Sequence, residues 1–334
     1  MAKRVHIKDT DYLFLSAYIH AKEPKLIGRD RLERMLEAKT AEDSLKVLEE
    51  NGWTAAGGIE AGQLEKLLSK RREDVFGEMR AMAPDPKIVD LFMVKYDYHN
   101  AKVLIKAQGM GISGKELLSS SGRISSKKLS EATLEGSFGD MPKTFAASFL
   151  DATNTLSRTG DPQIADFVLD KAYFAELYEI AVSTGSDFLV GYVKLSIDAA
   201  NLRSVVRAVR MKKDVGFLKQ ALVPGGTVSE TGVLSAFDTP ETALELFGKT
   251  QLRKIIDGAN AAVRGGKLTE FEKQCDNALT QYLSEAKRVG FNEKPLIVYL
   301  CAVEAEISSI RIVMAGQFAG LTAEKIKERL REGV

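Results

Sequence analysis

The sequence has few of the side chains on which metal sites and disulfide-rich folds depend. Its 334 residues include only two cysteines, three histidines and one tryptophan. Two cysteines do not build a disulfide framework, and this usage is typical of a reducing compartment. No histidine lies at ligand spacing from another His, Cys or carboxylate cluster. We therefore expect no metal site, no cofactor and no catalytic group, and we interpret Cys275 and Cys301 as buried thiols.

An excess of one charge and a long apolar run are also missing. The 47 Lys and Arg residues almost balance the 46 Asp and Glu residues, for a net charge of +1. This balance predicts no attraction to nucleic acid or anionic lipid. The longest apolar run covers residues 296–303, and a membrane span needs about 20. The first residues, MAKRVHIKDTDY, lack the apolar core of a signal peptide, so we expect a cytoplasmic protein, at most peripheral to a membrane.

The chain does contain a conspicuous helical pattern at residues 186–214. Apolar side chains recur there at the three-and-four spacing of one long amphipathic helix. Asp198 and Asn201 lie three residues apart in its middle and therefore share a face, and Arg203 follows two residues later.

The same polar pattern occurs earlier in the chain. Residues 87–106 carry Asp97, Asn100 and Lys102 at corresponding places, so D-x-x-N-x-(K/R) appears twice, 101 residues apart. Such a recurrence within two helical patterns indicates an internal repeat.

A third, weaker copy is predicted at residues 296–314. There Glu304 takes the acidic position, Ile307 replaces the Asn and Ser309 replaces the base, with Arg311 two residues further on. Two copies rest on identity, whereas the third rests mainly on the helical pattern.

A second spacing supports the alignment of Asp198 with Glu304. Thr133 precedes Asp198 by 65 residues, and Thr239 precedes Glu304 by the same distance. Thr40 and Thr239 both begin T-x-E-x-x-L, a pattern typical of a helix N-terminus.

Together these recurrences predict three homologous units near residues 28–112, 124–214 and 228–318. Similar connectors, GRIS at 122–125 and GTVS at 226–229, recur 104 residues apart. Strand signals are weak, so we predict an all-α protein. Its three helical-bundle domains are expected at 1–115 with an N-terminal helix, 116–215, and 216–334 with a C-terminal helix.

Two roles are open for the recurring polar residues. They can be buried groups that hold equivalent helices in register, or they can line a shared cavity that binds a partner. We favour the structural role because one binding event does not require a copy in every unit, and an unsatisfied buried member would cost roughly 1–3 kcal/mol. Weaker candidates for partner contacts are Gly109, Gly111, Gly225, Gly226, Arg210, Lys212 and Lys213. The three basic residues also suit the negative end of a helix dipole.

One motif is similar to a dinucleotide-binding loop. Gly109, Gly111 and Gly114 spell G-x-G-x-x-G, which binds a pyrophosphate when it follows a strand and opens a helix. Here it follows a long helical pattern, so we interpret it as a helix end and connector.

The repeats resemble a known family. YDYHNAK (96–102), SIDAANLRSVVRAVR (196–210) and AEISSIRIVMAGQFAGLTAEKIKERLR (305–331) resemble the C subunit of archaeal and bacterial V/A-type ATPases, whose eukaryotic counterpart is the d subunit of the vacuolar proton pump. The resemblance covers nearly the whole chain, and Ile307 is its main departure from the Asn-centred pattern.

The resemblance implies a non-catalytic connector of the central stalk. It implies a pseudo-threefold funnel of three helical domains that sits on the cytoplasmic side of the membrane proteolipid ring. The funnel would receive the shaft, which the D and F subunits form, and transmit torque for ion transport. We expect a monomer when the protein is isolated.

Two other functions are compatible with helical repeats. An open helical-repeat adaptor of another complex would share the repeats but form an elongated particle. A nucleotide-using enzyme would be built around residues 109–114, and its thermal stability would rise on addition of NAD or ATP.

Overall fold

The computed structural model describes residues 7–53 and 61–331. All regular elements in these residues are helices and none is a strand, which confirms the predicted all-α class. The chain packs into two compact units, one formed by residues 1–89 with 280–334 and one by residues 90–279. The first unit therefore combines both ends of the chain. The three repeat domains are defined by recurrence in the sequence, whereas these two units are defined by packing. The three domains therefore remain a prediction.

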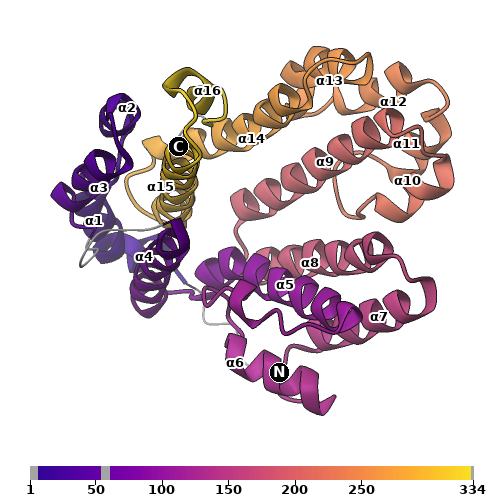
Figure 1. The fold of residues 1–334 in the computed structure, drawn as a ribbon, viewed down its shortest axis with the longest axis horizontal. Coiled ribbons are helices and arrows are strands. Elements are labelled where there is room, and N and C mark those ends of the chain that lie inside the picture. The colour runs from indigo at the N-terminus through magenta and orange to yellow at the C-terminus, as the bar shows by residue number, and fades with distance from the viewer. Residues whose placement is uncertain (1–6, 54–60, 332–334) are drawn as a thin grey trace. The chain divides into compact units, whose positions relative to one another are not determined.

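The helices of the two-ended unit (Figure 1) surround one central helix, α15. They are α1 Leu13–Lys22, α2 Arg29–Glu37, α3 Ala41–Glu50, α4 Ala61–Met82, α15 Glu293–Phe318 and α16 Ala323–Lys327, with the short 3-10 helices Asp9–Tyr12, Glu23–Lys25 and Glu285–Arg288. α15 contacts α1, α2, α3, α4 and α16. Its buried residues lie on all sides of the helix, as expected for a helix enclosed by others.

The continuous unit contains α6 to α13, and α5 and α14 each extend across the boundary between the units. The bounds are α5 Lys87–Met110, α6 Ser126–Glu135, α7 Lys143–Thr159, α8 Pro162–Thr184, α9 Asp187–Arg210, α10 Val215–Ala221, α11 Glu230–Ala236, α12 Pro240–Phe247, α13 Ile256–Val263 and α14 Leu268–Ser284, with 3-10 helices Lys115–Leu117 and Gln251–Ile255. α9 packs against α8, α10, α12 and α13.

Local sequence sets the ends of the long helix α9. The Ser186 hydroxyl accepts a hydrogen bond from the Leu189 N–H at 3.2 Å and caps the N-terminus. At the other end, Lys212 adopts a left-handed backbone conformation with φ of 53°, and the Lys213 N–H turns back to the Ala208 carbonyl at 2.9 Å. The helix therefore ends at Arg210, four residues before the predicted end at residue 214.

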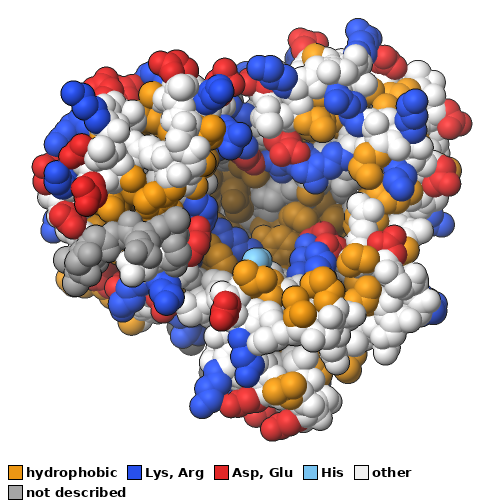
Figure 2. All heavy atoms as spheres, in the orientation of Figure 1, with side chains coloured by type: hydrophobic (Ala, Val, Ile, Leu, Met, Phe, Trp, Pro, Cys, Tyr) orange, Lys and Arg blue, Asp and Glu red, His pale blue; other side chains and the backbone are white. Residues whose placement is uncertain are grey.

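The surface is mixed in charge. On the face in Figure 2, Lys and Arg side chains alternate with Asp and Glu, as the small net charge implies. Within residues 7–53 and 61–331, no helix combines the length and the apolar character that a membrane crossing demands.

Candidate functional site

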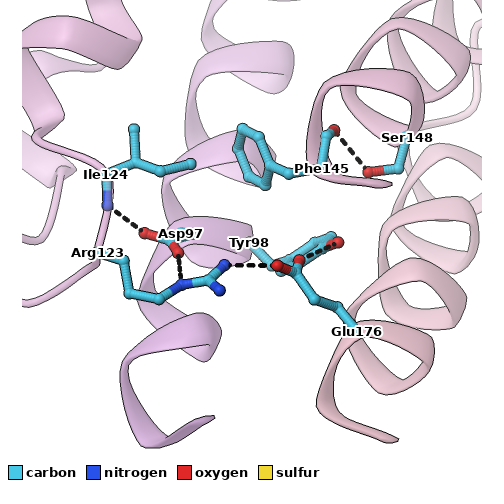
Figure 3. A network of polar contacts seen from close by, with 7 residues as sticks. All are labelled: Asp97, Tyr98, Arg123, Ile124, Phe145, Ser148 and Glu176. Carbon is cyan, nitrogen blue, oxygen red and sulfur yellow. Dashed lines mark hydrogen bonds and ion pairs between the residues drawn. The ribbon is translucent and has the colours of Figure 1, made fainter. Parts of the chain in front are cut away.

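The polar residues of α5 form a buried junction with the connector that follows the helix (Figure 3). Asp97 is fully buried. One carboxylate oxygen accepts the Ile124 N–H at 3.0 Å, and the other accepts the Arg123 Nε–H at 2.8 Å. Because Ile124 lies two residues before α6, Asp97 fixes the place where the next helix begins.

The Arg123 guanidinium connects two buried carboxylates. Its Nη2 donates to Glu176 of α8 at 2.8 Å, and the Tyr98 hydroxyl donates to the other Glu176 oxygen at 2.9 Å. Burial raises the pKa of Asp97 to about 6, although Arg123 and the Ile124 N–H favour the ionised form. The network therefore joins α5, its connector and α8, with both carboxylates buried and the Arg123 side chain 17% exposed.

Asn100 adds a second attachment one helical turn along α5. Its side-chain NH2 donates to the Ser119 carbonyl at 2.8 Å, and its oxygen accepts the Ser119 N–H at 2.7 Å. The amide thus replaces a backbone partner for the connector and satisfies its own donor and acceptor.

An equivalent junction exists on α9. Asp198 accepts the N–H groups of Thr227 and Val228 at 2.8 and 3.1 Å, and Val228 lies two residues before α11. Asn201 makes the same reciprocal pair with the Val223 backbone, both bonds at 2.8 Å. Burial raises the pKa of Asp198 as well.

Glycine is required at corresponding places of these two connectors. A Cβ atom at Gly122 would collide with the Asp97 carboxylate, and a Cβ atom at Gly226 would collide with that of Asp198. Each glycine lies two residues before the N–H that the carboxylate accepts. The close approach of backbone to carboxylate therefore explains the recurring connectors.

A third junction lies in the two-ended unit and uses Glu306 of α15. This side chain is buried, and one of its oxygens accepts the Ile27 N–H at 2.7 Å. Ile27 again lies two residues before a helix, α2. Arg71 of α4 approaches the other oxygen at 3.6 Å. Burial raises the pKa of Glu306, and Arg71 opposes this effect.

These hydrogen bonds favour Glu306 over the expected Glu304 as the third acidic position. Ser309 and Arg311 follow Glu306 by three and five residues, as Asn201 and Arg203 follow Asp198. Glu304 is partly exposed and pairs with Arg72 at 3.0 Å.

The register expected from the sequence thus differs by two residues, because it depended on a shared spacing from threonines. Thr133 is not a helix cap but lies inside α6, where its hydroxyl donates to the Leu129 carbonyl. Thr40 does cap α3, through a 3.1 Å bond from the Asp43 N–H. The spacing of 65 residues therefore compared unlike positions.

The basic member of each copy forms an ion pair with the α-helix that comes before a long helix in the chain. α8 precedes α9, α14 precedes α15, and α4 precedes α5. Lys102 reaches Asp170 of α8 at 2.6 Å, and Arg203 reaches Asp276 of α14 at 2.5 Å. Arg311 reaches Glu65 of α4 at 2.6 Å. These pairs are partly exposed, so each contributes no more than about 1 kcal/mol. They are informative because the same pairing recurs in each copy: α5 pairs with α8, α9 with α14, and α15 with α4.

The predicted basic contact residues divide into two kinds. Arg210 donates to the carbonyls of Ala262 and Gly266 at 2.7 and 2.8 Å, so it holds the end of α13. Lys212 and Lys213 are exposed.

The glycines predicted as contacts have structural roles as well. A Cβ atom at Gly109 would lie 2.9 Å from the Leu156 Cδ2 atom, and Gly111 and Gly225 have φ of 68° and 96°. The G-x-G-x-x-G motif begins at Gly109 in the last turn of helix α5 rather than after a strand, so it lacks the strand–loop–helix context of a pyrophosphate site.

Among the described residues, no group of three His, Cys, Asp or Glu side chains could hold a metal ion. Both cysteines are buried and neither forms a disulfide, and burial raises the pKa of the Cys275 thiol to about 12.

Four charged members of the junctions were not expected from the sequence: Arg71, Arg123, Glu176 and Glu306. Arg123 lies within the recurring connector, so it carried a signal, although Thr227 replaces it in the next copy. Glu176 has no marked pattern around it, and only the packing of α8 reveals its role.

Known proteins match this chain over nearly its whole length. Residues 15–329 match the family model of the ATP synthase (C/AC39) subunit. The chain is 22% identical to the C subunit of the V-type sodium ATPase of Enterococcus hirae, over 96% of this chain and 98% of that protein. It is 24% identical to the C subunit of the A-type ATP synthase of Methanocaldococcus jannaschii, over 96% and 86%, and 24% identical to that of Pyrococcus horikoshii, over 97% and 91%. The chain therefore belongs to the ATP synthase (C/AC39) subunit family, which includes the C subunits of V-type and A-type ATPases.

Proposed function

We propose that this chain is the non-catalytic connector of the central stalk in a rotary V/A-type ATPase. It couples the rotating shaft, which the D and F subunits form, to the membrane proteolipid ring and transmits torque between them. The observation that carries the proposal is the family match over residues 15–329. The alignment with one relative, the C subunit of the V-type sodium ATPase of Enterococcus hirae, also covers 98% of that protein. The protein takes no cofactor and no nucleic acid, and it acts through contacts alone.

The recurring junctions support a pseudo-threefold funnel built from domains 1–115, 116–215 and 216–334. Three carboxylates each accept the N–H of a residue two positions before a helix. Three bases pair long helices with partner helices in one repeating order. A torque coupler must not deform under load, and the four hydrogen bonds at each of the junctions of Asp97 and Asp198 resist local opening.

The location follows from the partners. The protein is cytoplasmic and peripheral, held at the cytoplasmic face of the membrane by its contact with the ring. It is a monomer when isolated.

A native pull-down tests this function. Tagged protein is recovered from mildly solubilised membranes of its own source, and the bound proteins are identified by mass spectrometry. Shaft subunits and proteolipid should co-purify in fixed ratio, and removal of the chain should abolish ATP-driven ion uptake by membrane vesicles while released soluble heads still hydrolyse ATP. Recovery of another complex without proteolipid would contradict the connector function and favour the adaptor function.

A second experiment addresses the shape of the isolated protein. Small-angle scattering should give a compact, roughly threefold envelope. A rod would contradict the funnel and favour the open helical-repeat adaptor.

A further inference from the structure

The three junctions are alike in geometry but differ in how the chain connects them. In the first two, the helix that carries the carboxylate continues directly into the connector that carries the N–H. The partners are 27 residues apart at Asp97 and 30 at Asp198. Glu306 and Ile27 are 279 residues apart. α15 is near the end of the chain, and the connector before α2 is near its beginning, so no short stretch of chain holds this junction together.

The third junction also has fewer hydrogen bonds. The first two have four each, two on the carboxylate and two on the asparagine. At the third, the Ile27 N–H donates to one Glu306 oxygen, and the ion pair with Arg71 at 3.6 Å is too long to count as a further bond. The other Glu306 oxygen is buried and has no hydrogen-bond partner among the described residues, which is also true of one Asp198 oxygen, so the difference lies in the number of bonds made. Ser309 stands where the other helices carry Asn and has no carboxamide for the reciprocal pair.

The connector of the third junction also lacks the glycine that the other two connectors carry. Lys25 lies two residues before Ile27, where the other connectors carry Gly122 and Gly226. A glycine lets the backbone approach a short Asp side chain, whereas a longer Glu side chain reaches a backbone that is held further away. The third junction is therefore a looser version of the same contact.

We propose that the contact between Glu306 and Ile27 is a clasp that joins the two ends of the chain and opens on its own. Opening separates α2 from α15 and breaks the Ile27–Glu306 bond together with the 2.7 Å bond from Gln317 to the Met35 carbonyl. The junctions at Asp97 and Asp198 stay closed. This inference concerns the chain alone and does not depend on the proposed function.

The clasp has a regulatory consequence. A ligand that binds the closed form more tightly than the open form shifts the equilibrium by its difference in affinity. A partner that contacts α2 and α15 together therefore closes the clasp, and a partner that contacts α2 alone leaves it free to open.

Amide hydrogen exchange of the full chain tests the clasp. Protection factors are compared at Ile27, Ile124 and Val228, three amides that each donate to a buried carboxylate. One net hydrogen bond corresponds to about a fivefold change in the closed-to-open ratio, so three fewer bonds predict protection at Ile27 lower on the order of 100-fold. Protection at Ile27 equal to or above that of the other two amides would overturn the proposal.

A pair of variants on α15 shows whether opening is local. Glu306→Gln should lower protection at Ile27 and through α2, and leave Ile124 and Val228 unchanged. Glu304→Gln, two residues away and paired with Arg72, is the matched control and should leave Ile27 unchanged. If Glu306→Gln lowers protection at all three amides alike, the clasp does not open separately. The wild-type comparison decides the question even where the variant folds poorly.

Discussion

At the scale of single residues, an acid and an amide three positions apart carry most of the information. Asp97 with Asn100 and Asp198 with Asn201 stand out in the sequence because both side chains and their spacing recur. Their buried hydrogen bonds to following connectors agree with the structural role. Glu306 escaped sequence reasoning because Ser309 stands three residues after it, where the other two copies carry Asn, and the threonine spacing pointed to Glu304 instead. Residues of different types can therefore make hydrogen bonds of the same geometry.

Removing the carboxylate of Asp198 should destabilise the protein. Asp198→Ala leaves the partly buried N–H groups of Thr227 and Val228 without their acceptor, at a cost of about 1–3 kcal/mol in the free energy of unfolding. Asp187→Ala on the same helix is the control, since Asp187 is exposed and affects only the helix dipole, by about 0.5 kcal/mol. Urea unfolding measures both, and an unchanged midpoint for Asp198→Ala would refute the structural role.

Asp97 should make stability depend on pH. Its folded pKa of about 6 lies above the ordinary value of 3.8, so the folded state holds the proton more tightly than the unfolded state between these values. Its contribution is complete below the unfolded pKa and is lost as the pH rises through 6. Relative to Asp97→Asn, the wild type should gain about 1 kcal/mol between pH 7 and pH 5. Chemical unfolding of both proteins at the two pH values checks the sign, and a loss on acidification would show that the Arg123 ion pair dominates.

At the scale of helices, the sequence located the long elements better than their ends or their partners. α8 begins at Pro162 and ends before Gly185, because Pro suits the first turn and Gly185, with φ of 76°, suits the left-handed position. α9 ends early because Lys212 takes that conformation without being glycine. Local rules mark helix ends well only where the expected residue type is present. Which helices pair is a non-local property, and the sequence offered no sign that α15 packs on α4.

Lys212 offers a test at the end of α9. A non-glycine residue in the left-handed region costs roughly 1 kcal/mol, so Lys212→Gly should raise the free energy of unfolding by up to about that amount. Lys213→Gly is the control and should lower stability by a few tenths of a kcal/mol, because Lys213 does not need positive φ. Thermal unfolding of both variants distinguishes them. Destabilisation of Lys212→Gly equal to that of Lys213→Gly would show that the backbone is not strained there.

At the scale of the whole molecule, the division into packed units could not be deduced from repeats. Recurrence in the sequence follows the order of the chain, whereas one compact unit unites residues 1–89 with 280–334. Its central helix α15 is supplied by the far end of the chain. Family membership, in contrast, could be inferred from motifs, because these are short and local.

The two units should unfold in separate steps. Ending the chain at residue 284 removes α15, against which α1, α2, α3 and α4 pack, and should abolish the transition of the two-ended unit. The transition of residues 90–279 should persist, since that segment is continuous. Calorimetry measures both. A chain that ends after Lys327 retains α16 and is the control, which should show both transitions; loss of both on truncation at 284 would mean that the units fold as one.

The two buried thiols have a practical consequence for following these motions. Cys275 belongs to the continuous unit and Cys301 to the two-ended unit, and both are shielded from solvent. A maleimide reagent modifies such a sulfur only while its surroundings are transiently exposed, so the labelling rate of each cysteine reports the breathing of one unit. The native chain thus carries a separate reporter in each half of its architecture, and no residue needs to be introduced to read them.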